Sequence, residues 1–213
     1  SHEPQHFSDF SQRRDDDLMT AADASEDVRR WFRTRVAATL AGQGRSRFVA
    51  KYPRLSLRLG WLDALFPDAV FVHVQRDWRA TARSTVKRRR KRASYGGGWF
   101  GVRVPGWREL LQVSDEVAAA RVFRQVTLQL EEMARLLPGR IIPLRYETLC
   151  ERPQEVFSSL AGACGLPCPP DFEASWPHVR RSENQKWKQD LDAALLAQAR
   201  AEDPAFYARY EFD

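Results

Sequence analysis

A helix that spans a membrane requires about 20 consecutive apolar residues. No apolar run in the sequence approaches that length, so no membrane span is predicted. Cysteine is scarce, with only Cys150, Cys164 and Cys168 in the chain. Three is an odd number, and their spacing is not that of a disulfide framework, which favours a reducing compartment. No signal-peptide pattern opens the chain, and we expect a cytoplasmic protein. The 213 residues, 43% of them hydrophobic, predict one soluble globular domain over residues 1–213.

Acidic residues are almost absent from one stretch. The whole chain has 34 Lys and Arg against 28 Asp and Glu. Between Arg76 and Arg92, however, nine basic residues accompany Asp77 alone. A positive patch of this kind indicates an anionic ligand or partner, with nucleic acid, phosphate, sulfate and acidic glycans all open.

Helical and strand patterns alternate along the chain. Apolar, β-branched runs predict strands at residues 47–51, 69–75 and 140–146. Helical spacing and capping residues predict helices over 25–42, 55–66, 77–92, 114–137, 153–165 and 191–201. Ser25 and Asp77 are predicted N-caps, and Gly42 and Gly44 are predicted to end the first helix. The alternation predicts an α/β protein with an open, mostly parallel sheet flanked by helices. The nearly continuous apolarity of 69–75 predicts a strand covered on both faces.

Arg76 follows the clearest strand, where ligands of parallel sheets gather. Its guanidinium suits bidentate binding of a phosphate or sulfate, and the next helix should add free N–H groups and the positive end of its dipole. Ser84 falls two turns later on the same face, and the small Ala80 between them leaves room for a ligand. The alternative is a salt-bridged arginine and a surface serine without a ligand.

Four segments extend this pattern: "AKYP" (50–53), residues 66–85, residues 144–167 and residues 180–191. Their order and spacing resemble the signature segments of sulfotransferases that use 3'-phosphoadenosine 5'-phosphosulfate (PAPS), in the bacterial and protein-tyrosine-like branch. The Arg-x7-Ser pattern and the late "KW" are the most specific parts. The resemblance implies a P-loop-NTPase-like fold. It also implies metal-free transfer of a sulfuryl group from PAPS to a hydroxyl or phenol, releasing 3',5'-adenosine bisphosphate (PAP).

The resemblance also implies which residues bind the nucleotide. Arg76 and Ser84 match the pair that holds its 3'-phosphate. Tyr146 matches the tyrosine beside the adenine; an ordinary core tyrosine is its alternative. A late segment matches the one that closes over the nucleotide phosphate, and its implied contacts are Arg180, Arg181, Ser182 and Lys186.

Two further residues are implied as catalytic. Lys51 matches a lysine near the sulfuryl group, where a cation stabilises the negative charge that develops on the leaving phosphate. Glu3 stands where some relatives place the general base, and His2 and His6 are its rivals. Without the resemblance, Lys51 is an exposed lysine at a strand end and Glu3 an ordinary residue near the chain start.

One departure from the family is large. The first strand and its phosphosulfate-binding loop, which combines a basic residue, a glycine and several hydroxyl residues after a proline, do not occur in these 213 residues. Either the chain begins after that loop or another polypeptide supplies it. We expect a larger natural protein.

The acceptor is not defined by the sequence. Trp99, Phe100 and Trp107, in a glycine-rich stretch, are predicted to shape its pocket for a small molecule, a glycan or a peptide hydroxyl. The alternative function is a non-catalytic module whose basic run 87–92 binds a polyanion, either an acidic glycan or nucleic acid. A nucleotide kinase is disfavoured because no Walker lysine loop is present. We predict no specific nucleic-acid partner and leave the oligomeric state open.

Overall fold

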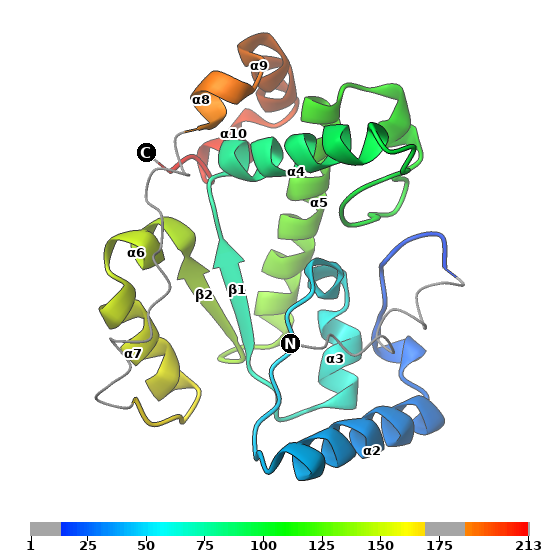
Figure 1. The fold of residues 1–213 in the computed structure, drawn as a ribbon, viewed down its shortest axis with the longest axis vertical. Coiled ribbons are helices and arrows are strands. Elements are labelled where there is room, and N and C mark those ends of the chain that lie inside the picture. The colour runs from blue at the N-terminus through cyan, green and yellow to red at the C-terminus, as the bar shows by residue number, and fades with distance from the viewer. Residues whose placement is uncertain (1–13, 169–185, 213) are drawn as a thin grey trace. The chain divides into compact units, whose positions relative to one another are not determined.

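The computed structural model describes residues 14–168 and 186–212 (Figure 1). By their internal contacts these residues divide into two compact units. The first comprises the described residues within Ser1–Ala69, with Gly101–Gln112 and Gln125–Pro138; the second comprises those within Val70–Phe100, Val113–Arg124 and Gly139–Asp213. A division by contacts does not test the predicted single domain, which stays a prediction.

The first unit is helical. Its elements are η1 (Ala21–Asp23), α2 (Glu26–Gln43), η2 (Pro53–Leu57), α3 (Leu59–Leu65) and η3 (Glu109–Gln112). The ends predicted for α2 are confirmed: the Val28 N–H donates to the Ser25 hydroxyl at 3.4 Å, and Gly44 ends the helix in the left-handed region, at φ 59°. In the core, the Phe32 ring meets Trp61 edge-on, with 5.1 Å between centroids.

The predicted strand at 47–51 is absent from the structure, and Val49 within it is 86% exposed. A strand persists only through hydrogen bonds to a neighbouring strand, and no described strand pairs with this segment. The prediction of a strand here is therefore wrong for the described chain. The segment is an irregular connection between α2 and η2.

The helix predicted over 55–66 is divided at Arg58, whose backbone leaves the helical region, at φ −127° and ψ 15°. The Arg58 side chain is fully buried. Its Nε donates to the Asp17 carbonyl at 3.1 Å, and its Nη2 lies 3.4 Å from an Asp17 carboxylate oxygen. Burial lowers the pKa of Arg58, and Asp17 partly offsets that effect. The break thus coincides with a buried ion pair whose partner is 41 positions away in the sequence.

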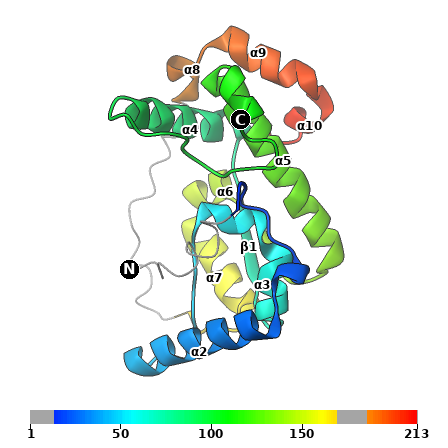
Figure 2. The same cartoon turned by 90° about the vertical axis from the view of Figure 1, so that its right-hand side faces the viewer.

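The second unit carries the sheet. Strands β1 (Phe71–Gln75) and β2 (Ile141–Arg145) run parallel, with Phe71 paired to Ile141 and Gln75 to Arg145. Its helices are α4 (Trp78–Ala93), α6 (Tyr146–Glu151), α7 (Pro153–Ala163), α8 (Trp187–Asp190), α9 (Ala193–Glu202) and α10 (Pro204–Ala208). Helix α5 (Asp115–Leu136) begins in this unit and ends in the first. Figure 2 shows these elements from a second side. The predicted α/β class, with a parallel sheet and flanking helices, is confirmed.

One face of β1 is less covered than its apolar sequence predicts. Val70, Val72 and Val74 alternate along the chain and are 43%, 39% and 53% exposed. They share one face because side chains alternate in a strand. The prediction of a strand covered on both faces is wrong for the described residues, in which the sheet has only two strands. Among the helices that the structure describes, none combines the length and apolarity needed to cross a membrane.

Candidate functional site

The structure brings Arg76 and Tyr146 together at the carboxyl ends of β1 and β2. Gln75 and Arg145 are paired in the parallel register, so the residues after them emerge side by side. The Arg76 guanidinium carbon lies 4.7 Å from the centroid of the Tyr146 ring, within the range of a cation–π contact. Burial, and secondarily a hydrogen bond with Cys150, raise the pKa of Tyr146 above that of an ordinary phenol.

Asp77 is the N-cap residue of α4 and is almost fully buried. Its carboxylate accepts the N–H groups of Arg79 at 2.8 Å and Ala80 at 3.3 Å, which confirms the predicted cap. Arg79 Nη2 also donates to this carboxylate at 2.6 Å. The expectation that this helix start offers free N–H groups to an anion is wrong for these two, because Asp77 occupies both. Arg76 and the helix dipole remain as attractive groups.

Ser84 lies two turns into α4 and is half-buried. Its position, seven residues after Asp77 and four after Ala80, puts it on the same side of the helix. Six residues of rise, about 9 Å, separate Trp78 from Ser84 along the axis. No hydrogen bond within the described chain involves the Ser84 hydroxyl. Its contact with a phosphate stays a prediction.

Helix α8 packs against α4. The Arg79 guanidinium stacks 4.2 Å from the Trp187 ring centroid, and the Arg83 Nε donates to Asp190 Oδ2 at 2.6 Å. These two contacts fix the helix that follows Lys186, which is its N-cap residue. The other predicted contacts of this segment, Arg180, Arg181 and Ser182, lie outside the described residues.

Sequence reasoning missed the residues that converge on Asp77 from elsewhere. The Phe212 N–H donates to Asp77 Oδ2 at 2.8 Å. The Arg145 guanidinium stacks 4.0 Å from the Phe212 ring centroid. In addition, the Asp77 N–H donates to Glu147 Oε1 at 3.1 Å. The only signal in the sequence was adjacency, since Glu147 follows Tyr146 directly and Asp77 follows Arg76.

Of the predicted catalytic residues, the structure describes only Lys51. Lys51 is exposed and lies in the first unit, just before η2. Arg76, Ser84 and Tyr146 all lie in the second unit. Glu3 lies outside the described residues, as do its rivals His2 and His6. The catalytic roles therefore stay predictions.

The aromatic residues predicted for the acceptor divide between the units, because Trp99 and Phe100 fall in the second and Trp107 in the first. The Arg89 guanidinium carbon stacks 3.7 Å from the Trp99 ring centroid. Trp107 Nε1 donates to the Asp15 carbonyl at 2.9 Å. Both rings thus have packing roles within their units, and acceptor binding by the three aromatics stays a prediction.

The basic run 87–92 has an inward and an outward part. Arg89 is buried, where its Nε donates to the Phe100 carbonyl at 3.1 Å, and burial lowers its pKa. Arg90 is exposed, and its Nη2 donates to the buried Glu116 carboxylate at 2.6 Å. The remaining four side chains are exposed: Lys87, Arg88, Lys91 and Arg92. None of these four takes part in an ion pair with another described residue.

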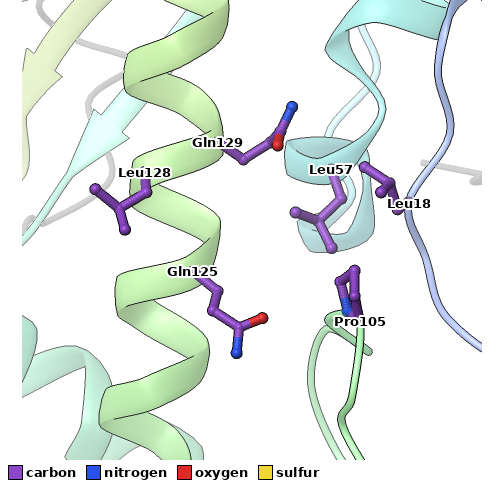
Figure 3. A pocket seen from close by; sticks show the side chains of 6 residues that line it. All are labelled: Leu18, Leu57, Pro105, Gln125, Leu128 and Gln129. Atoms are coloured by element: carbon purple, nitrogen blue, oxygen red, sulfur yellow. The ribbon is translucent and has the colours of Figure 1, made fainter.

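The first unit contains a hollow of about 300 Å³. Its lining is mostly apolar: Leu18, Leu57, Pro105, Gln125, Leu128 and Gln129. Figure 3 shows Gln125 and Gln129 projecting from α5 toward the side where Leu57, Leu18 and Pro105 lie. None of the predicted site residues lines it.

The second unit is therefore an α/β structure whose parallel strands are followed directly by an arginine and a tyrosine suited to an anionic, ring-containing ligand. Residues 2–170 match the model of the sulfotransferase family, which covers most of the chain, and the protein belongs to that family. The predicted family is thus confirmed; its branch stays a prediction.

A solved structure with the same fold is the "Sulfotransferase Domain from the Curacin Biosynthetic Pathway". It is 17% identical, with a TM-score of 0.56, and the match covers 84% of this chain and 68% of that one. At this identity the match supports the sulfotransferase fold alone. A comparison with curated proteins finds no match.

Proposed function

We propose that the protein transfers a sulfuryl group from PAPS to a hydroxyl or phenol acceptor and releases PAP. Membership of the sulfotransferase family supports sulfuryl transfer in general. The observation that carries the choice of donor is the contact between Arg76 and Tyr146 at the paired strand ends. A cation beside a flat, neutral ring suits a ligand with a phosphate next to an aromatic base.

PAPS supplies the activated sulfuryl group, and the residues of this chain bind and orient it. Arg76 binds the 3'-phosphate through charge-assisted hydrogen bonds, and the Ser84 hydroxyl donates another. The Tyr146 ring contacts the adenine. Lys186 lies at the start of α8, which its contacts with α4 hold in place. Arg180, Arg181 and Ser182 complete the phosphate contacts in this proposal.

The chemical step requires a cation and a base. Lys51 stabilises the charge that grows on the bridging oxygen as the bond to sulfur breaks. Glu3 accepts the proton of the acceptor hydroxyl while that oxygen attacks sulfur in line. Family resemblance supports both assignments. The acceptor is a small molecule, a glycan or a peptide hydroxyl.

Binding of PAP tests the proposed donor. We expect PAP to bind at least about tenfold more tightly than 5'-AMP, because hydrogen bonds to a charged 3'-phosphate contribute about 1.5–3 kcal/mol. Isothermal titration calorimetry on the intact protein measures both dissociation constants at one salt concentration. Equal affinities for PAP and 5'-AMP, or no binding of PAP, would contradict the proposal.

A second candidate function is polyanion binding by the exposed side of α4. Four cations there lack ionic partners among the described residues: Lys87, Arg88, Lys91 and Arg92. This arrangement favours a polyanion, either an acidic glycan or nucleic acid, as ligand, because a dense row of charges releases counterions from it. The cations in the last turn of α4 also interact favourably with the negative end of the helix dipole, and this role requires no ligand.

Charge reversal separates the two functions. If α4 is a polyanion site, Lys87→Glu with Lys91→Glu should weaken binding of a heparin oligosaccharide about tenfold or more and flatten its salt dependence. PAP affinity should not change. Arg45→Glu with Arg47→Glu is the matched control, since both residues are exposed cations of the first unit. Heparin affinity is measured by fluorescence anisotropy. If both double variants lose affinity equally, the attraction is nonspecific and this function is rejected.

A further inference from the structure

One hydrogen bond joins the two segments that carry Arg76 and Tyr146. The Asp77 N–H donates to Glu147 Oε1 at 3.1 Å, although the residues are 70 positions apart. Both are buried, Asp77 to 1% and Glu147 to 8% exposure. Backbone pairing of the two strands ends at Gln75 and Arg145, so this bond holds the chains together beyond the sheet.

The direction of this N–H fixes the backbone of Arg76. The nitrogen of Asp77 belongs to the peptide plane that joins Arg76 to Asp77, and the orientation of that rigid plane sets the ψ angle of Arg76. The ψ angle in turn constrains where the Arg76 side chain leaves the chain. On the other segment, Glu147 directly follows Tyr146 at the start of α6. The bond therefore couples the placement of the guanidinium to that of the ring.

Burial of the Glu147 carboxylate costs free energy. Its Oε1 accepts the Asp77 N–H, but its Oε2 is buried without a hydrogen bond to any described residue, and Arg145 Nε lies 3.9 Å from this oxygen. A buried carboxylate with one unsatisfied oxygen lowers stability relative to an apolar side chain of similar size. Its presence is better explained by a requirement for placement than by a gain in stability.

We propose that Glu147 is a positioning residue of the nucleotide site: by accepting the Asp77 N–H, it holds Arg76 beside Tyr146 in the arrangement that binds the 3'-phosphate of PAP. This inference rests on the proposed function. Glu147 acts through Arg76 and does not itself touch the nucleotide. Asp77 reinforces the arrangement, because its carboxylate also ties down α4 and Phe212.

Three substitutions of Glu147 separate positioning from stability. Glu147→Gln keeps an oxygen acceptor in the same place and should bind PAP within about threefold of wild type. Glu147→Met removes the acceptor at similar volume, and Glu147→Asp retains the charge but withdraws the oxygen by one methylene, about 1.5 Å. Both should weaken PAP binding about tenfold and reduce the preference for PAP over 5'-AMP, since the 3'-phosphate contact is the one displaced. Glu155→Ala, an exposed carboxylate paired with Arg152, is the control and should bind PAP as wild type does.

A double-mutant cycle with Arg76→Ala provides the readout that a purely structural role would not produce. If Glu147 acts through Arg76, adding Glu147→Met to Arg76→Ala should cause no further loss of PAP affinity. Calorimetry, at a temperature where thermal denaturation shows the variants folded, gives the four dissociation constants. If Glu147→Met does not fold, Glu147→Asp replaces it in the cycle.

The outcomes distinguish this inference from the proposed function. Wild-type affinity in Glu147→Met or Glu147→Asp, or additive losses in the cycle, would overturn the role of Glu147 while PAP binding by the wild type still stands. Absence of PAP binding by the wild-type protein would instead overturn the proposed function, and the positioning role with it.

Discussion

Arg76→Ala should weaken PAP binding by about 10- to 100-fold and change the affinity for 5'-AMP by less than about threefold. The reason is that a charge-assisted, bidentate contact contributes about 1.5–3 kcal/mol and is made only when the 3'-phosphate is present. Arg76→Lys should recover part of the loss. Its ammonium keeps the charge but lacks the planar fork and stacks less well on Tyr146.

Calorimetric titration of both nucleotides into each variant tests this result, and the informative quantity is the ratio of the two dissociation constants. Arg30→Ala is a suitable control because that side chain is exposed and pairs only with the exposed Asp27 among the ion pairs of the described residues. Ser84→Ala should reduce PAP affinity by a smaller factor, about fivefold, because it removes one neutral donor. Parallel losses for PAP and 5'-AMP in Arg76→Ala would mean that the arginine supports the fold rather than the 3'-phosphate.

Lys51→Ala should lower kcat by about 100- to 1,000-fold while leaving the dissociation constant of PAP nearly unchanged. A fixed cation that meets charge only as it develops contributes to the transition state and little to ground-state binding. Removal of the Lys51 charge should therefore lower kcat and leave PAP binding nearly unchanged. The rate of PAP formation from PAPS, with a simple phenol as acceptor, measures this effect in the intact protein.

Two control variants make the Lys51 result interpretable. Lys51→Arg keeps a positive charge at a shifted position and should retain more activity than the alanine variant. Arg45→Ala removes another exposed cation of the same unit and should leave kcat unchanged. An unaltered kcat in Lys51→Ala would remove this residue from the mechanism, whatever the nucleotide affinity.

Features set by neighbouring residues were predictable from the sequence. The Ser25 and Asp77 caps and the left-handed Gly44 each depend on a few adjacent backbone groups, so composition and spacing located them. Strand β1 was predicted because its β-branched residues are consecutive. Arg76 follows one predicted strand and Tyr146 ends another, and parallel pairing at Gln75 and Arg145 brings them together.

Features set by distant partners were not predictable. The buried pair of Arg58 with Asp17 joins residues far apart in the sequence, and helical periodicity contains no information about it. A strand at 47–51 requires a neighbour that local sequence does not specify. Glu147 and Phe212 look ordinary in the sequence, and their importance arises only because folding brings both to Asp77.

The bond between Phe212 and Asp77 has a consequence for synthesis of the protein. Ribosomes make chains from the N-terminus, so Arg76 and Tyr146 emerge long before residue 212. The carboxylate that anchors α4 gains its last partner only once that late residue has left the exit tunnel. The contacts of Asp77 are therefore completed only after residue 212 has emerged, later than the segments that carry Arg76 and Tyr146.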